Sequence, residues 1–216
     1  MTLSELKETF YSLLRNYAVD NGRIDVLWHE IDRNYSDTNR HYHTLHHLAN
    51  VLTELIGVKG KIQDWQTLLF TLYYHDIIYS PMRSDNEEKS AELAAERMQQ
   101  IGVPSDKIRL CKEQIFATKL HNDAVDGDTN FFTDADLAIF GQPWKVYSEY
   151  YKNIRKEFSI FPDVVYSTGR RKVLRHFLAM DRIFKTDYFF KKFEARAKHN
   201  LEKEIEFLND PGKLDH

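Results

Sequence analysis

The sequence predicts an all-α protein, and three observations favour this fold class. Glycine and proline, the residues that most disfavour helix interiors, account for only 8 and 5 of the 216 residues. Apolar residues recur at helical spacing along most of the chain, and no stretch shows convincing strand alternation flanked by turn residues. The apolar and charged fractions, 42% and 29%, are typical of a globular chain. We expect one domain over residues 1–216, a bundle of about eight or nine helices.

The expected helices follow from periodicity and from signals at their ends. Thr2 and Glu5 have the spacing of a capping box at the first helix. Gly57 and Gly102 each follow a periodic segment, and Pro81 lies beyond the most apolar one. That segment, 64–79, is apolar almost all round, which predicts a central buried helix. The expected helices cover residues 3–18, 24–34, the histidine-rich stretch to about 56, 64–79, 85–100, 105–120, 144–158, 164–184 and 188–208, with a polar loop at 121–130 and a short apolar segment after it.

Charge and cysteine content exclude several classes of protein. The net charge of −3 and the pI near 6.4 give no indication of a nucleic-acid or membrane partner. The start of the chain lacks the apolar core of a signal peptide, and no 18-residue apolar run occurs, so we expect a cytoplasmic location.

The single cysteine, Cys111, lies in an apolar-periodic stretch and is expected to be an inert core thiol. Either a monomer or a homodimer is compatible with the sequence.

Four histidines in the stretch RHYHTLHHLANVL, residues 40–52, form the first candidate site. His43 and His47 are four residues apart and would share one helix face, where two imidazoles can bind the same metal ion. The glutamate of the zinc-protease motif H-E-x-x-H is missing. Metal binding and ordinary polar contacts therefore both remain open for this pair.

Two further features contain aspartate in apolar surroundings. His75 and Asp76 are adjacent within the most apolar predicted helix, where a buried carboxylate needs a partner. They could hydrogen-bond to each other or both ligate a metal ion. Asp134 and Asp136 lie just before an apolar turn, where each could cap a helix or bind a metal.

Taken in order, these features give the pattern H…HD…D, which resembles the HD superfamily of metal-dependent phosphohydrolases. The chain is similar to one subfamily of uncharacterised predicted HD phosphohydrolases, in motifs that span about residues 40–204. These motifs are R-x-Y-H-x-x-x-H, Y-H-D-x-x-Y, S-D-N-E-x-x-S-A, A-T-K-x-H, D-A-D-L-A-I-x-G, I-R-x-E-[FY], G-R-R-x-V-L and E-x-x-A-x-x-N-L.

The resemblance implies an HD-type helical bundle with one divalent metal ion: Mn, Mg, Co, Ni, Zn or Fe. By position in the motifs, the implied ligands are His47, His75, Asp76 and Asp136. His47 is preferred to His43 because an aliphatic residue follows it four positions later, as in the superfamily. Asp136 is preferred to Asp134 because the last superfamily aspartate usually follows an alanine.

The implied activity is hydrolysis of a phosphate ester, with a small phosphorylated substrate such as a nucleotide. This chemistry needs groups that move protons and cations that contact the phosphate. The catalytic candidates are Glu87, Glu88, His43 and His121, and the phosphate-binding candidates are Arg40, Lys119 and Arg170. The alternatives are a capping box that joins Ser84 to Glu87, a helix C-cap at His121, and surface ion pairs for the cations.

Two competing functions remain open. A two-metal HD phosphodiesterase or diiron oxygenase would need two further histidines between the His75–Asp76 doublet and Asp136, and that interval contains only His121. Alternatively, the domain could bind a metal ion or nucleotide without catalysing a reaction.

Overall fold

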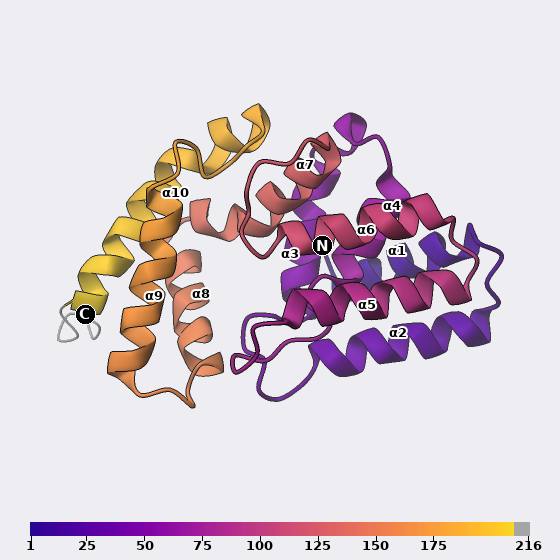
Figure 1. Cartoon of the computed structure of the whole chain (residues 1–216), viewed down its shortest axis with the longest axis horizontal. Helices are drawn as coiled ribbons and strands as arrows, with labels where there is room; N and C mark the ends of the chain where they lie inside the picture. The colour runs from indigo at the N-terminus through magenta and orange to yellow at the C-terminus, as the bar shows by residue number, and fades with distance from the viewer. Residues whose placement is uncertain (210–216) are drawn as a thin grey trace. The chain divides into compact units, whose positions relative to one another are not determined.

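The structure, a computed structural model, describes residues 1–209, which contain ten α-helices and no β-strand (Figure 1). The all-α prediction is confirmed, but the expected number of helices is too low. The additional helix is α7, Gly127–Asp136, which begins inside the predicted polar loop. Asp126 Oδ2 accepts a hydrogen bond from the Thr129 N–H at 2.8 Å, as an N-cap does, so this polar stretch can start a helix. Within residues 1–209, no helix is long and apolar enough to cross a membrane.

The helices form two compact units, Met1–Asp136 and a second unit that begins at Leu137. The first unit contains α1 (Leu3–Arg15), α2 (Asn21–Tyr35), α3 (Leu45–Ile56), the short helix η1 (Lys59–Lys61), α4 (Trp65–Tyr74), α5 (Asn86–Gln100), α6 (Ser105–Ala117) and α7. The second contains the short helix η2 (Leu137–Gly141), α8 (Trp144–Glu157), α9 (Asp163–Leu178) and α10 (Asp187–Asn209). That the whole chain forms one domain stays a prediction.

Helix α4 is at the centre of the first unit, as its sequence predicts. All of its residues from Thr67 to Tyr74 are buried. It contacts α1, α3, α5, α6 and α7. These helices surround α4 because its surface is apolar on all sides and must be buried. The Tyr73 hydroxyl satisfies its hydrogen-bonding requirement by donating to the Leu6 carbonyl at 2.7 Å.

The end of α4 differs from the prediction, and this places the His75–Asp76 doublet outside the helix. The helix ends at Tyr74 instead of continuing to 79. The Asp76 N–H donates to the Tyr35 hydroxyl at 3.2 Å, and the Asp76 carbonyl accepts from Arg40 at 2.8 Å. Because distant side chains satisfy these backbone groups, the chain can leave the helix without leaving them unpaired.

The second unit is held together by buried polar contacts between its helices. Arg170 on α9 forms an ion pair with Glu204 on α10, with an Nε–Oε1 distance of 2.7 Å. Helix α9 ends at Leu178, earlier than the predicted 184. The reason is similar to that at α4, since the buried Glu194 carboxylate accepts from the N–H groups of Ile183 and Phe184 at 3.1 Å.

Gly141, at the end of η2, is a position where any larger residue should destabilise the second unit. A Cβ atom there would overlap the Phe193 side chain on α10. We expect Gly141→Ala to cost about 1–3 kcal/mol, the usual range for overpacking a core. Gly169, within α9, has open space around its Cβ position, so Gly169→Ala should be neutral or stabilising by up to about 1 kcal/mol. Denaturant unfolding of both variants would measure the difference, and equal stability would contradict it.

Cys111 is fully buried on α6, which confirms the prediction of a core thiol. Burial raises the pKa of this thiol to about 12, although a contact with Thr71 partly opposes the rise. Because the thiolate is the reactive form, the folded chain should not react with an aromatic disulfide reagent at about pH 8. After denaturation, the same reagent should titrate one thiol per chain. Rapid reaction of the folded chain would show that the thiol is accessible.

Candidate metal centre in the first unit

Three mutually contacting helices of the first unit bring the predicted metal ligands together. His47 is on α3, His75 is the C-cap residue of α4, and Asp136 is the last residue of α7. Asp76 follows in the turn after α4. Helices α3, α4 and α7 contact one another in pairs, so residues far apart in sequence meet at one place.

The ligand atoms of His47, His75 and Asp136 converge on one point. The two Nε2 atoms are 3.2 Å apart, and Asp136 Oδ1 lies 3.2 Å from that of His47 and 3.7 Å from that of His75. Ligands bound about 2.1 Å from a cation are about 3.0 Å apart at a right angle and about 3.4 Å apart at the tetrahedral angle. The two distances of 3.2 Å fall in this range, and the third, from Asp136 Oδ1 to His75 Nε2, is about 0.3 Å longer than its upper end. The group His47–His75–Asp136 could therefore hold a metal ion.

The Asp76 carboxylate borders the same point from another side. Its Oδ2 lies 3.2 Å from His75 Nε2 and 3.8 Å from His47 Nε2. The imidazoles are almost completely buried, with 2% and 0% of their side-chain surface exposed, whereas Asp76 and Asp136 retain 19% and 14%. The nitrogen ligands thus form the buried side of the centre, and the carboxylates lie on the side nearer to solvent.

Contacts to the outer nitrogens turn both imidazoles toward the centre. His75 Nδ1 lies 3.0 Å from the Leu72 carbonyl, which can only accept, so Nδ1 carries a proton, and in the neutral ring Nε2 carries the lone pair. His47 Nδ1 lies 3.2 Å from the Tyr42 hydroxyl. Partners of this kind orient histidines that bind metals. The R-x-Y-H motif contains Tyr42 but gives no indication of this contact.

Electrostatics at the centre favour a positive charge between the carboxylates. Burial lowers the pKa of His47. For His75, burial opposes protonation, but the Asp76 carboxylate outweighs it and raises the pKa to about 9. The same contact outweighs the effect of burial on Asp76 and lowers its pKa. A divalent cation would satisfy these carboxylates in place of the imidazole proton, because a histidine must be neutral to ligate.

His121 lies beside the outer carboxylate oxygen of Asp136, and His43 lies near the Asp76 oxygen that faces the centre. His121 Nε2 is 3.2 Å from Asp136 Oδ2, and a left-handed backbone with φ 52° places this residue after the end of α6. His43 Nε2 is 3.9 Å from Asp76 Oδ2. The expectation that His43 and His47 share a helix face is wrong, because α3 begins only at Leu45. Their rings still lie close together, with centroids 5.7 Å apart.

The candidates in the first turn of α5, Glu87 and Glu88, form an ion-pair cluster with Lys119. Its Nζ lies 2.5 Å from Glu88 Oε1 and 3.6 Å from Glu87 Oε2, and it donates to the Ser84 carbonyl at 2.8 Å. Helix α5 begins at Asn86 without a side-chain cap, so the capping-box alternative for Ser84 and Glu87 is wrong. The roles of Glu87, Glu88 and Lys119 in catalysis stay predictions.

Both arginines predicted to contact phosphate have buried partners of their own. Arg40 donates to backbone carbonyls around the metal centre, and Arg170 is paired with Glu204 in the second unit. Phosphate binding by either guanidinium stays a prediction. His41 and His46, the other two histidines of the stretch 40–52, are exposed.

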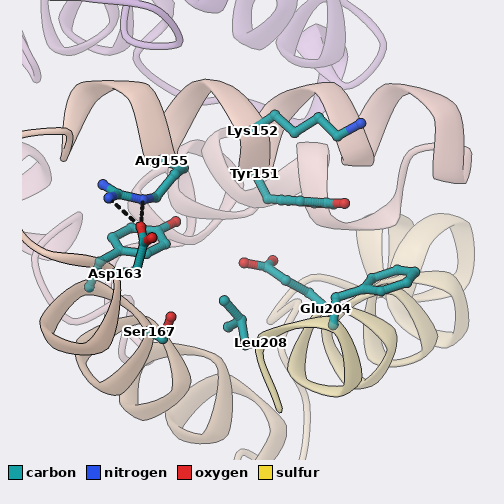
Figure 2. Close-up of a pocket in the computed structure, with 9 residues that line it drawn as sticks. Tyr151, Lys152, Arg155, Asp163, Ser167, Glu204 and Leu208 are labelled. Atoms are coloured by element: carbon teal, nitrogen blue, oxygen red, sulfur yellow. Dashed lines mark hydrogen bonds and ion pairs between the residues drawn. The ribbon is translucent and has the colours of Figure 1, made fainter. Parts of the chain in front are cut away.

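The second unit contains a cavity of about 320 Å³ between α8, α9 and α10 (Figure 2). In Figure 2 the Glu204 carboxylate points into it, and the Arg155–Asp163 ion pair lies at one side. Both carboxylates already have arginine partners, and within residues 1–209 the only converging group of metal-binding side chains is the one in the first unit. The metal centre is therefore the better candidate for chemistry.

No protein-family model, curated protein or solved structure matches the chain. The similarity to HD phosphohydrolases therefore depends on the motifs in the sequence. Independently of any family, the described chain is all-helical and has a His/His/Asp group that could hold a metal ion.

Proposed function

We propose that the chain is a metal-dependent phosphohydrolase of the HD type, with one divalent cation held by His47, His75, Asp76 and Asp136. The observation that supports this most is that the two imidazole Nε2 atoms are 3.2 Å apart and that each of the two carboxylates lies 3.2–3.8 Å from both of them. Mixed nitrogen and oxygen ligands suit Zn, Mn, Fe, Co or Ni. Two carboxylates also balance the charge of a dication.

The side chains around the centre are suited to hydrolysis of a phosphate ester. A bound divalent cation would supply Lewis-acid activation of a water molecule and of a phosphoryl oxygen. His121, next to the outer oxygen of Asp136, and His43, 3.9 Å from Asp76 Oδ2, would hold or deliver the protons that attack and departure require. Lys119 would contact the phosphate by exchanging its Glu88 partner for a phosphate oxygen.

A phosphatase screen tests this proposal. Metal-free chain would be incubated with Mn, Co, Ni, Mg or Zn and with nitrophenyl phosphate, nucleotides and other small phosphate esters. We expect phosphate release that depends on the added metal and disappears in Asp136→Asn. Asp134→Asn is the matched control, because Asp134 lies on the same helix but outside the converging group.

The screen also separates hydrolysis from the non-catalytic alternative. A chain that binds a metal ion but releases phosphate from no ester, with any of these metals, would contradict hydrolysis and favour a binding module.

A further inference from the structure

Arg40 is a buried cation whose partners are backbone carbonyls. Its NH1 donates to the carbonyls of His43 at 3.1 Å and Asp76 at 2.8 Å, and its NH2 donates to that of Ile77 at 2.8 Å. Only 9% of the residue is exposed, and within residues 1–209 it forms no ion pair with a carboxylate. Hydrogen bonds satisfy a guanidinium buried in this way, but removing its charge from water costs free energy. Stability alone therefore does not explain why an arginine lies here.

The three carbonyls belong to the two segments that carry metal ligands. His43 directly precedes Thr44, the N-cap of α3, the helix that carries His47. Asp76 and Ile77 form the turn in which Asp76 presents its carboxylate to the centre. One rigid, planar group therefore joins the start of α3 to the turn after α4.

Aromatic rings fix the position of the guanidinium. Its carbon lies 4.8 Å from the centroid of the Tyr35 ring and 5.5 Å from that of Tyr79. The Tyr35 hydroxyl also accepts the Asp76 N–H at 3.2 Å, so the same tyrosine supports both the arginine and the turn. The planar fork of arginine can stack on rings and serve several carbonyls together, which the point charge of lysine cannot do.

We infer that Arg40 is a positioning residue of the metal centre, which sets metal affinity by holding the Asp76 turn against the start of α3. This inference rests on the proposed metal site and goes beyond it, because the guanidinium of Arg40 hydrogen-bonds to backbone carbonyls and not to the ligand atoms. Residues that orient metal ligands typically change metal affinity by about 10- to 100-fold when replaced.

Cobalt titration of the full chain tests this role, with affinity and the visible absorption of bound Co(II) as readouts. Arg40→Met should weaken cobalt binding by about 10- to 100-fold and alter the absorption spectrum at saturation, because Asp76 is no longer held in place. Arg40→Lys should fall between Arg40→Met and the unchanged chain. Arg97→Met is the matched control, since Arg97 makes two 2.8 Å hydrogen bonds to Glu30 in the same unit, outside the centre. It should lower thermal stability without changing cobalt affinity.

Tyr35→Phe keeps the inference testable if Arg40→Met does not fold. It removes only the hydroxyl that accepts the Asp76 N–H and should also weaken cobalt binding. If the Arg40 and Tyr35 variants lose only thermal stability, as Arg97→Met should, the positioning role is wrong. The positioning role is also wrong if Arg40→Met binds cobalt normally and loses only affinity for a phosphate ester. Failure of the unchanged chain to bind cobalt would instead contradict the proposed metal site itself.

Discussion

Asp136→Asn is expected to lower the affinity of the chain for a divalent cation by more than about 100-fold. A loss of about 100-fold is the upper end of what replacing a residue that only orients metal ligands typically causes. Asp136 Oδ1 lies 3.2 Å from His47 Nε2 and 3.7 Å from His75 Nε2. The Asp136 carboxylate also supplies one of the two negative charges at the centre. Asparagine keeps the shape but provides a neutral oxygen, which hard and borderline dications bind less well. The remaining charge on Asp76 would not balance a dication.

Calorimetric titration with Mn or Zn would measure this loss. The comparison variant is Asp134→Asn, which changes a buried aspartate on the same helix and should keep nearly normal affinity. The reverse result, with affinity lost only in Asp134→Asn, would show that the wrong aspartate has been assigned.

Arg170→Met is expected to be the most destabilising single change in the second unit, at about 3–5 kcal/mol. Only 1% of the Glu204 side chain is exposed, and Arg170 contacts both of its carboxylate oxygens, at 2.7 and 3.0 Å. Without the guanidinium, the buried charge would keep, among residues 1–209, the hydroxyl of Tyr147 as its one hydrogen-bond partner. Denaturant unfolding followed by circular dichroism would measure the change.

Two further variants show whether this cost comes from the unpaired charge. Replacing both partners, in Arg170→Met with Glu204→Leu, should recover much of the lost stability, because no buried charge is left behind. Arg182→Gln removes an exposed pair with Asp187 in the same unit and should cost no more than about 1 kcal/mol. A cost for Arg170→Met as small as that for Arg182→Gln would contradict the account.

Sequence periodicity predicted where most helices lie, because an apolar stripe at helical spacing must be buried. It failed at helix ends that depend on distant side chains. The predicted helix 64–79 ends at Tyr74 because Tyr35 and Arg40 satisfy the backbone of Asp76. Nothing local to residues 75–79 indicates those partners. By contrast, the start of α7 had a local signal, the spacing of Asp126 and Thr129, that could have been used.

The candidate site could be predicted to a similar extent. Motif order predicts His47, His75, Asp76 and Asp136 as ligands, and the structure brings their side chains together. The sequence does not predict the contacts that hold these side chains in place. Arg40 is predicted to contact phosphate, yet its guanidinium faces backbone carbonyls, an arrangement fixed by the packing of Tyr35 and Tyr79.

The number of metal ions per chain is the most direct test of a single metal centre built on these four side chains. The chain would be saturated with Mn or Zn, freed of unbound ion, and examined by elemental analysis against protein concentration. We predict one ion per chain, and close to none in Asp136→Asn. Two ions per chain would contradict the single centre and favour a two-metal enzyme, and no bound ion in the unchanged chain would contradict the metal site.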